Sequence, residues 1–148
     1  MTCYRVSKYD PTCRANGIYQ KDEWTAISDI GRVYADKMFT EDDYLAAEQS
    51  YIDFVLCVCN LQKINIVTVK NLENHNNLAW KNGQKLNLQE SVAFIKSCLR
   101  EQCWGRLVSK KFVFETGYDY YMLIQSNLSL DTMEQLAHQC HLFVEEWK

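Results

Sequence analysis

Residues 110–125, KKFVFETGYDYYMLIQ, constrain the fold more than any other stretch of this chain. Aromatic side chains alternate with smaller or polar ones up to Thr116, and a second alternating run starts at Tyr118. Such residues favour the pleated surface of a sheet, and Gly117 can supply the left-handed backbone of a tight turn. We therefore predict two strands joined at Thr116-Gly117. The second strand is apolar on nearly both faces, so it is expected to lie centrally in a sheet covered by helices.

Helical periodicity predicts three helices in the remaining sequence. Each is preceded by a residue whose side chain can accept a hydrogen bond from a free backbone amide at the helix start. These capping residues are Thr40 for the first helix, Asn87 with Glu90 for the second, and Ser129 or Asp131 for the third. Residues at helical spacing mark the buried side of the first helix, among them Leu45, Glu48, Tyr51, Val55 and Cys59.

Further strands are predicted at residues 2–6, 64–72 and 142–144, which gives the element order β-α-β-α-β-β-α-β. Because one connection is a hairpin, the fold class is α+β, with a mixed or antiparallel central sheet flanked by helices. The 148 residues fit one domain, residues 1–148. Residues 12–39 form a long connection that is expected to pack on this domain, with a helical turn near residues 28–34. Connections of this length are often functional.

Charge and hydropathy restrict the classes of partner. The net charge is −3, from 16 Lys and Arg against 19 Asp and Glu, and the basic residues form no patch. Direct binding of nucleic acid is therefore not expected, whereas a basic protein partner would suit the acidic excess. The sequence has neither an apolar run of about 18 residues that could span a membrane nor an apolar N-terminal secretory segment. We expect a cytoplasmic protein, and its oligomeric state stays open.

Seven cysteines are an unusually high number for a chain of this length. Without a secretory route, we expect them to be reduced and to act as small buried hydrophobic residues. Cys59, Cys103 and Cys140 fall on the buried stripes of the predicted helices.

Cysteine and histidine can together form a zinc site or a nucleophilic catalytic site. His138, Cys140 and His141 are potential zinc ligands, but no second pair with ligand spacing accompanies them, so we expect no metal and no cofactor. Cysteine paired with His75, His138 or His141 could form a nucleophilic site, although no cysteine stands in a known catalytic motif.

Acidic residues in the long connection and at the first helix start are candidates for docking a basic partner. Carboxylates here also suit the positive end of a helix, so a solvated surface is the alternative interpretation. Trp24 or Tyr19 would act as an apolar anchor for the partner. Trp24 could instead anchor the connection to the core. The candidate partner-binding residues are Asp22, Glu23, Trp24, Asp29, Glu41, Asp42 and Asp43, with Asp119 or Glu145-Glu146 as the alternative docking region.

Several segments together resemble one known protein family. They are YRVSKYDP at the start, then GIYQKDEWTAISDIG, FTEDDYLAAEQSYI and GYDYYM, and finally LFVEEW. As a set they resemble a family of small bacterial cytosolic proteins that includes immunity proteins of contact-dependent growth inhibition systems. The resemblance covers nearly the whole chain. It implies a protein that binds and neutralises the carboxy-terminal domain of a cognate toxin, commonly a nuclease, in a one-to-one complex. These segments contain no catalytic motif, so we do not expect an enzyme.

Two other functions are left open by the residues themselves. One is a small cytosolic enzyme with a cysteine nucleophile, and the other is an adaptor protein whose partner is not a toxin. A toxin domain encoded by the neighbouring gene would favour immunity, whereas a metabolic operon would favour the enzyme.

Overall fold

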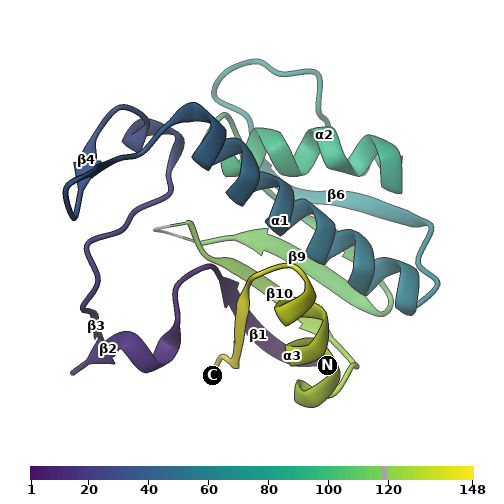
Figure 1. The fold of residues 1–148 in the computed structure, drawn as a ribbon. Coiled ribbons are helices and arrows are strands. Elements are labelled where there is room, and N and C mark those ends of the chain that lie inside the picture. The colour runs from purple at the N-terminus through teal and green to yellow at the C-terminus, as the bar shows by residue number, and fades with distance from the viewer. Residues whose placement is uncertain (118–119) are drawn as a thin grey trace.

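The computed structural model describes residues 1–117 and 120–148. It confirms the α+β class: three helices accompany a sheet of seven strands in the order β11-β1-β10-β9-β8-β6-β7 (Figure 1). Every neighbouring pair of strands in this sheet is antiparallel. Two predicted positions, Tyr118 in the second hairpin strand and Asp119 in the alternative docking region, lie outside the described residues.

The helices are α1 (Glu41–Leu61), α2 (Leu88–Leu99) and α3 (Leu130–Gln139). The sheet consists of β1 (Thr2–Ser7), β6 (Ile66–Glu73), β7 (Lys85–Asn87), β8 (Trp104–Ser109), β9 (Phe112–Thr116), β10 (Met122–Ser126) and β11 (Phe143–Glu146). Between β1 and α1 lie two short ribbons and two 3-10 turns: η1 (Pro11–Cys13), β2 (Arg14–Ala15), β3 (Ile18–Tyr19), η2 (Ile27–Asp29), β4 (Val33–Tyr34) and β5 (Lys37–Met38).

All three predicted helix starts are confirmed. The Thr40 hydroxyl accepts from the Asp43 amide at 3.1 Å, and the Asp43 carboxylate accepts from the Thr40 amide at 2.9 Å. Asn87 and Glu90 form the same reciprocal pair at the start of α2. Ser129, one of the two candidates, caps α3. Each cap satisfies amides that the helix itself leaves unpaired, so these starts depend on local sequence alone.

The predicted pairing of the two hairpin strands is confirmed, but the predicted turn is wrong. β9 ends at Thr116 and β10 starts only at Met122, so the connection is longer than a tight turn. Gly117 does not take the left-handed conformation; its amide donates to the Tyr121 carbonyl at 2.7 Å. The tight hairpin of the sheet lies one strand earlier, where Lys110-Lys111 joins β8 to β9.

Strands β7 and β8 were not predicted. β7 is only three residues long, and β8 contains Gly105, which usually weakens a strand. The structure shows why glycine stands there: a Cβ atom at Gly105 would lie 3.0 Å from the Phe94 ring and 3.4 Å from Leu72. The close approach of α2 to the sheet thus requires glycine at this position. β8 pairs with both β6 and β9, and this pairing overrides the poor strand propensity of glycine.

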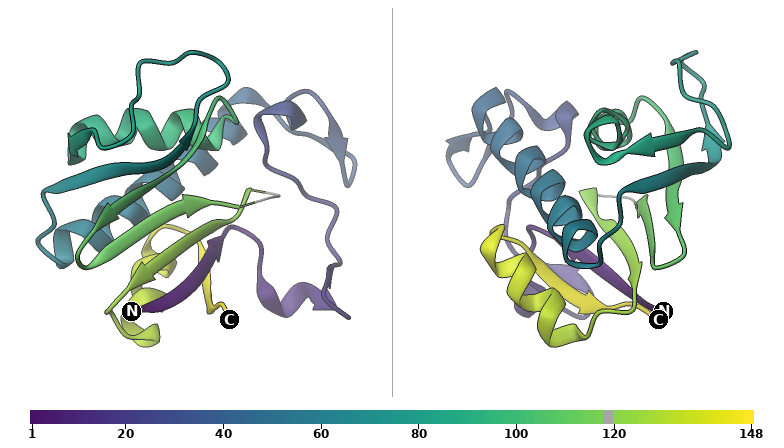
Figure 2. Two further views of the ribbon diagram at one scale, coloured as in Figure 1. Left: turned by 180° about the vertical axis from the view of Figure 1, so that it is seen from behind. Right: turned by 90° about the vertical axis from the view of Figure 1, so that its right-hand side faces the viewer.

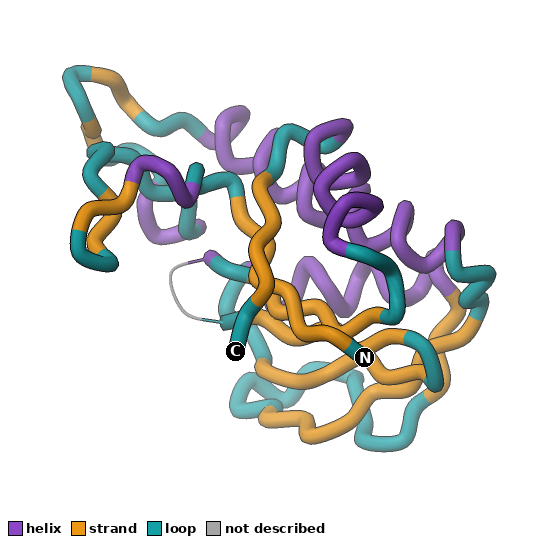
Figure 3. Tube along the Cα trace, turned by 90° about the horizontal axis from the view of Figure 1, so that it is seen from below, coloured by secondary structure: helices purple, strands orange, loops and turns teal. Residues whose placement is uncertain are grey.

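All three helices lie on one side of the sheet, with α1 between α2 and α3 (Figure 3). β10 is an interior strand, as predicted, but helices cover only one of its faces. Buried side chains on that face include Val6, Val69, Phe114, Met122 and Ile124. The opposite face carries half-buried charged residues.

None of the helices in residues 1–117 and 120–148 combines the length and the apolar character needed to span a membrane.

Residues 10–39, which we call the arm, run beside one end of the sheet from β1 to α1 (Figures 1 and 2). The predicted helical turn is the short η2. Ile27, Ile30 and Tyr34 pack against the main core, and Phe39 is buried in it, so the second half of the arm is packed on the domain as expected. The tips of its two ribbons project away from the helices (Figure 2).

Candidate functional site

The structure brings four of the predicted docking residues to one pocket of about 300 Å³. Asp22, Glu23 and Trp24 reach it from the middle of the arm, and Asp43 reaches it from the first turn of α1. Phe39 forms part of the wall. Of the other predicted residues, Asp29, Glu41 and Asp42 do not line this pocket.

Hydrogen bonds within the arm engage several of the predicted carboxylates. Asp22 accepts from the Ala35 amide at 2.9 Å, which ties the middle of the arm to the β4–β5 ribbon. Asp29 accepts from the Ala26 amide at 2.9 Å and from the Tyr34 hydroxyl at 2.8 Å. These side chains hold the arm together, so their removal would alter its conformation as well as its charge.

Glu23 and Asp43 are engaged in the same way. The Tyr19 hydroxyl donates to the Glu23 carboxylate, and Asp43 belongs to the α1 cap. Glu41 and Asp42, by contrast, are exposed on the first turn of α1, and neither has a hydrogen-bond or ion-pair partner in residues 1–117 or 120–148. Asp36, at the tip of the β4–β5 ribbon, is a third exposed carboxylate without such a partner, and it was not predicted.

The pocket itself already contains a cation. Lys8 lines it, with its Nζ atom 5.5 Å from the centre of the Phe39 ring. Burial lowers the pKa of the Lys8 ammonium group, although Glu23 and Asp43 act in the opposite direction. The pocket is therefore poorly suited to take a second basic side chain, and the carboxylates available to a partner are those around it.

Apolar side chains are exposed on both ribbons of the arm. Val33 is 60% and Met38 55% exposed on the β4–β5 ribbon, which also carries Asp36. Ile18 is 67% exposed on the separate β2–β3 ribbon, at the other end of the arm (Figure 1). Trp24 is 37% exposed, and its ring lies 6.1 Å from the ring of Tyr9, so it both anchors the arm and presents an apolar surface. Aromatic and apolar groups ringed by charge are the usual composition of a protein interface.

The acidic excess of the protein is concentrated in this region. Residues 10–43 contain eight Asp and Glu against four Lys and Arg, a net charge of −4, whereas the whole chain carries −3. The rest of the protein therefore has a net charge of +1. The excess of negative charge that a partner could meet therefore lies in the arm and the first turn of α1.

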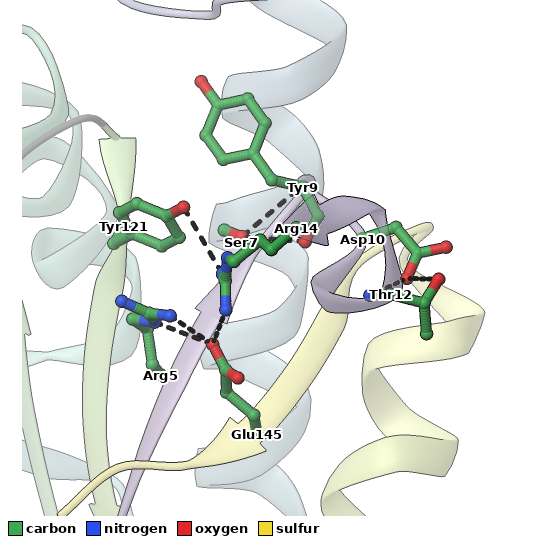
Figure 4. Close-up of polar contacts among 8 residues, drawn as sticks. All are labelled: Arg5, Ser7, Tyr9, Asp10, Thr12, Arg14, Tyr121 and Glu145. Carbon is green, nitrogen blue, oxygen red and sulfur yellow. Dashed lines mark hydrogen bonds and ion pairs between the residues drawn. The ribbon is translucent and has the colours of Figure 1, made fainter. Parts of the chain in front are cut away.

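A cluster that the sequence did not reveal anchors the base of the arm to the sheet (Figure 4). Arg5 of β1 and Arg14 of β2 both bind the Oε1 atom of Glu145 in β11, at 2.6 Å and 2.8 Å. The Arg5 guanidinium lies 4.6 Å from the ring centre of Tyr121 and 4.0 Å from that of Trp147. One member of this cluster, Glu145, belongs to the alternative docking region predicted from the sequence. The sequence did not predict that Arg5 and Arg14 bind that carboxylate.

Acidification is expected to weaken this cluster. Burial alone would raise the pKa of the Glu145 carboxyl, but hydrogen bonds from Arg14 and Arg5 hold it below its usual range. A depressed folded-state pKa contributes stability that is present above the ordinary glutamate pKa of about 4.3 and is lost as the pH falls through the folded-state value.

We therefore expect urea denaturation to show a loss of stability below about pH 4.3 that is smaller in Glu145→Gln than in the parent. Glu134→Gln is the control, because Glu134 is exposed and should leave the pH dependence unchanged. If Glu145→Gln and the parent lose the same stability between neutral and acidic pH, the arginine contacts do not stabilise the carboxylate.

Four of the cysteines are buried, and two of these are poor nucleophiles at neutral pH. Cys59, Cys98, Cys103 and Cys140 are buried, and all seven cysteines are free thiols. This confirms the predicted burial of Cys59, Cys103 and Cys140. Burial raises the pKa of Cys59 to about 12, and burial together with Cys57 raises the pKa of Cys140 to about 11, so both are protonated at neutral pH. The described residues contain no group of three or more His, Cys, Asp or Glu side chains placed to hold a metal ion.

The arm and the first turn of α1 thus form the strongest candidate site, a binding surface of exposed carboxylates and apolar side chains.

The family resemblance seen in the sequence stays a prediction. Comparison with protein-family models, with curated protein sequences and with solved structures finds no match for this chain.

Proposed function

We propose that the protein is a cytoplasmic immunity protein that binds a basic toxin domain, such as a nuclease, and blocks it by forming a one-to-one complex. The observation that carries this proposal is the concentration of the acidic excess at residues 10–43, a net charge of −4, beside exposed apolar side chains. The resemblance described above supplies the class of partner.

A nuclease must bind phosphate, so it carries a basic cleft, and an acidic surface can cover that cleft or a surface next to it. Asp36, Glu41 and Asp42 are free to pair with such a cleft, and Val33 and Met38 supply apolar area on the ribbon that carries Asp36. Charge would speed the encounter, and buried apolar contacts would slow dissociation.

The first test asks whether the protein protects against the toxin domain encoded beside its gene. We expect coexpression to restore growth, and the two purified proteins to elute as a one-to-one complex. Copurification of a partner that is harmless when expressed alone would favour the adaptor instead. Growth arrest despite coexpression would contradict the proposed function.

The second test locates the surface. We expect Glu41→Gln with Asp42→Asn to weaken binding by at least tenfold, about 1.4 kcal/mol, because the pair of free carboxylates is lost. The variant should melt within a few degrees of the parent, since neither side chain holds another residue and only the interaction with the positive end of α1 is lost. Isothermal titration and a thermal melt measure the two quantities.

A matched control removes the same charge from another helix start. Asp131→Asn with Glu134→Gln neutralises two exposed carboxylates at the beginning of α3, outside the arm. This control should bind as the parent does. If both double variants bind equally well while the parent still protects, the immunity function stands but the docking surface lies elsewhere.

A further inference from the structure

Two buried thiols lie against each other at the junction of α2 and β8. Cys98 is in the last turn of α2, and Cys103 immediately precedes β8. Their Sγ atoms are 3.8 Å apart and share a hydrogen bond, and the two residues are only 2% and 1% exposed. Among the seven cysteines, these two therefore have the geometry of a dithiol that is reduced and ready to react as a pair.

A small cavity reaches the Cys98 side of this pair. It has a volume of about 150 Å³ and is lined by Cys98, Glu101, Trp104 and neighbouring residues, whereas Cys103 lies behind Cys98 and does not line it. A molecule the size of water or hydrogen peroxide fits such a space, whereas a bulky thiol reagent does not. A small oxidant can therefore enter next to Cys98, within one side-chain contact of Cys103.

The contact between the two sulfurs shifts their pKa values in opposite directions. It lowers the pKa of Cys103, although burial acts to raise that pKa. The same contact, together with burial, raises the pKa of Cys98. Two adjacent sulfurs of which one loses its proton more readily than the other suit a reactive cysteine and its resolving partner.

We propose that Cys98 and Cys103 are an oxidative modification site, at which a peroxide converts the two thiols into an intramolecular disulfide. One of the two sulfurs, as a thiolate, attacks one oxygen of hydrogen peroxide, breaks the O–O bond and becomes a sulfenic acid, and the released hydroxide takes up a proton as water. The other sulfur, 3.8 Å away, then attacks the sulfenic sulfur and releases a second water. Two thiols and one peroxide give one disulfide and two waters, so the sulfurs lose the two electrons that the peroxide gains.

Formation of the bond requires only a local movement. The sulfurs must approach from 3.8 Å to about 2.05 Å, which rotation of the two side chains and a small shift of the turn between them can provide. The closed loop is short, so the disulfide should add little stability by restricting the unfolded chain. Arg100 lies within that loop and pairs with Glu48 of α1 at 2.8 Å, so the junction of α1 and α2 is the region that would respond.

The experiment treats the native parent protein with hydrogen peroxide, blocks remaining thiols with iodoacetamide after unfolding, and digests the protein with trypsin. Trypsin cleaves after Arg100, between the two cysteines, so a disulfide joins peptides 97–100 and 101–106 into one species. We expect this linked species, two hydrogens lighter than the two reduced peptides together, and we expect dithiothreitol to separate it. Cys98→Ser and Cys103→Ser should each abolish it, whereas Cys59→Ser should not.

Two results would overturn the proposal. One is full alkylation of both cysteines after peroxide treatment, which would mean that the pair does not react. The other is conversion of either cysteine to sulfinic or sulfonic acid without any linked species, which would mean that its neighbour does not resolve the sulfenic acid. Both readings come from the parent protein, so they do not depend on whether a serine variant folds.

Discussion

Replacing Glu48 with alanine is expected to lower the free energy of unfolding by about 3–5 kcal/mol. Glu48 is 2% exposed and accepts from Arg100 Nε and Nη2, both at 2.8 Å, so the pair joins the middle of α1 to the end of α2. The Tyr44 hydroxyl also donates to Glu48, at 2.7 Å, and itself accepts from Tyr120 at 3.2 Å. Alanine would leave a guanidinium and a buried hydroxyl without their acceptor.

A second variant separates the cost of an unpaired charge from the contribution of packing at this site. Glu48→Met with Arg100→Met removes both charges and keeps the volume, so it should recover much of the stability lost in Glu48→Ala. Urea denaturation of the parent, the single variant and the double variant measures the difference. A loss of less than about 1 kcal/mol in Glu48→Ala would mean that the carboxylate is not the acceptor on which α1 and α2 depend.

Tyr51→Phe is expected to cost about 1–3 kcal/mol for each buried backbone group that it leaves unpaired. The Tyr51 side chain is fully buried; its hydroxyl donates to the Tyr120 carbonyl at 2.7 Å and accepts from the Lys8 amide at 3.0 Å. Both partners lie far from Tyr51 in the sequence, one at the end of β1 and the other just before β10. Loss of a single oxygen atom would therefore loosen three elements at their meeting point.

Tyr34→Phe is the matched control. Its hydroxyl donates to Asp29 within the half-exposed arm, so its removal should cost less than about 1 kcal/mol. Chemical denaturation measures both variants. Equal midpoints for Tyr51→Phe and the parent would show that water satisfies the two backbone groups, in contradiction to their burial.

The sequence determined those parts of the fold that depend on near neighbours. Thr40, Asn87 and Ser129 start the three helices because each side chain accepts a hydrogen bond from the amide three residues further on. The run of apolar residues in β10 identified an interior strand, because only burial accommodates such a run. Helical spacing also placed Glu48 on the buried side of α1, although Leu45, from the same predicted set, is 42% exposed.

Contacts between distant residues were decided by the tertiary structure alone. Glu145 is 140 residues from Arg5 and 131 from Arg14, and no local pattern distinguishes it from Glu146. β8 is a strand despite Gly105 because it pairs with both β6 and β9, and glycine stands there because α2 packs too closely for a side chain. Strand pairing and packing at such separations depend on the whole domain and override local propensity.

The candidate site divides in the same way. The sequence placed seven residues in an acidic, aromatic region, and the structure brings four of them to one pocket. Only the tertiary structure separates Asp22 and Asp29, which bond the arm's own backbone, from Glu41 and Asp42, which are free for a partner. A carboxylate is available for docking only if the fold has given it no other donor, and donors far along the chain cannot be read from the residues beside it.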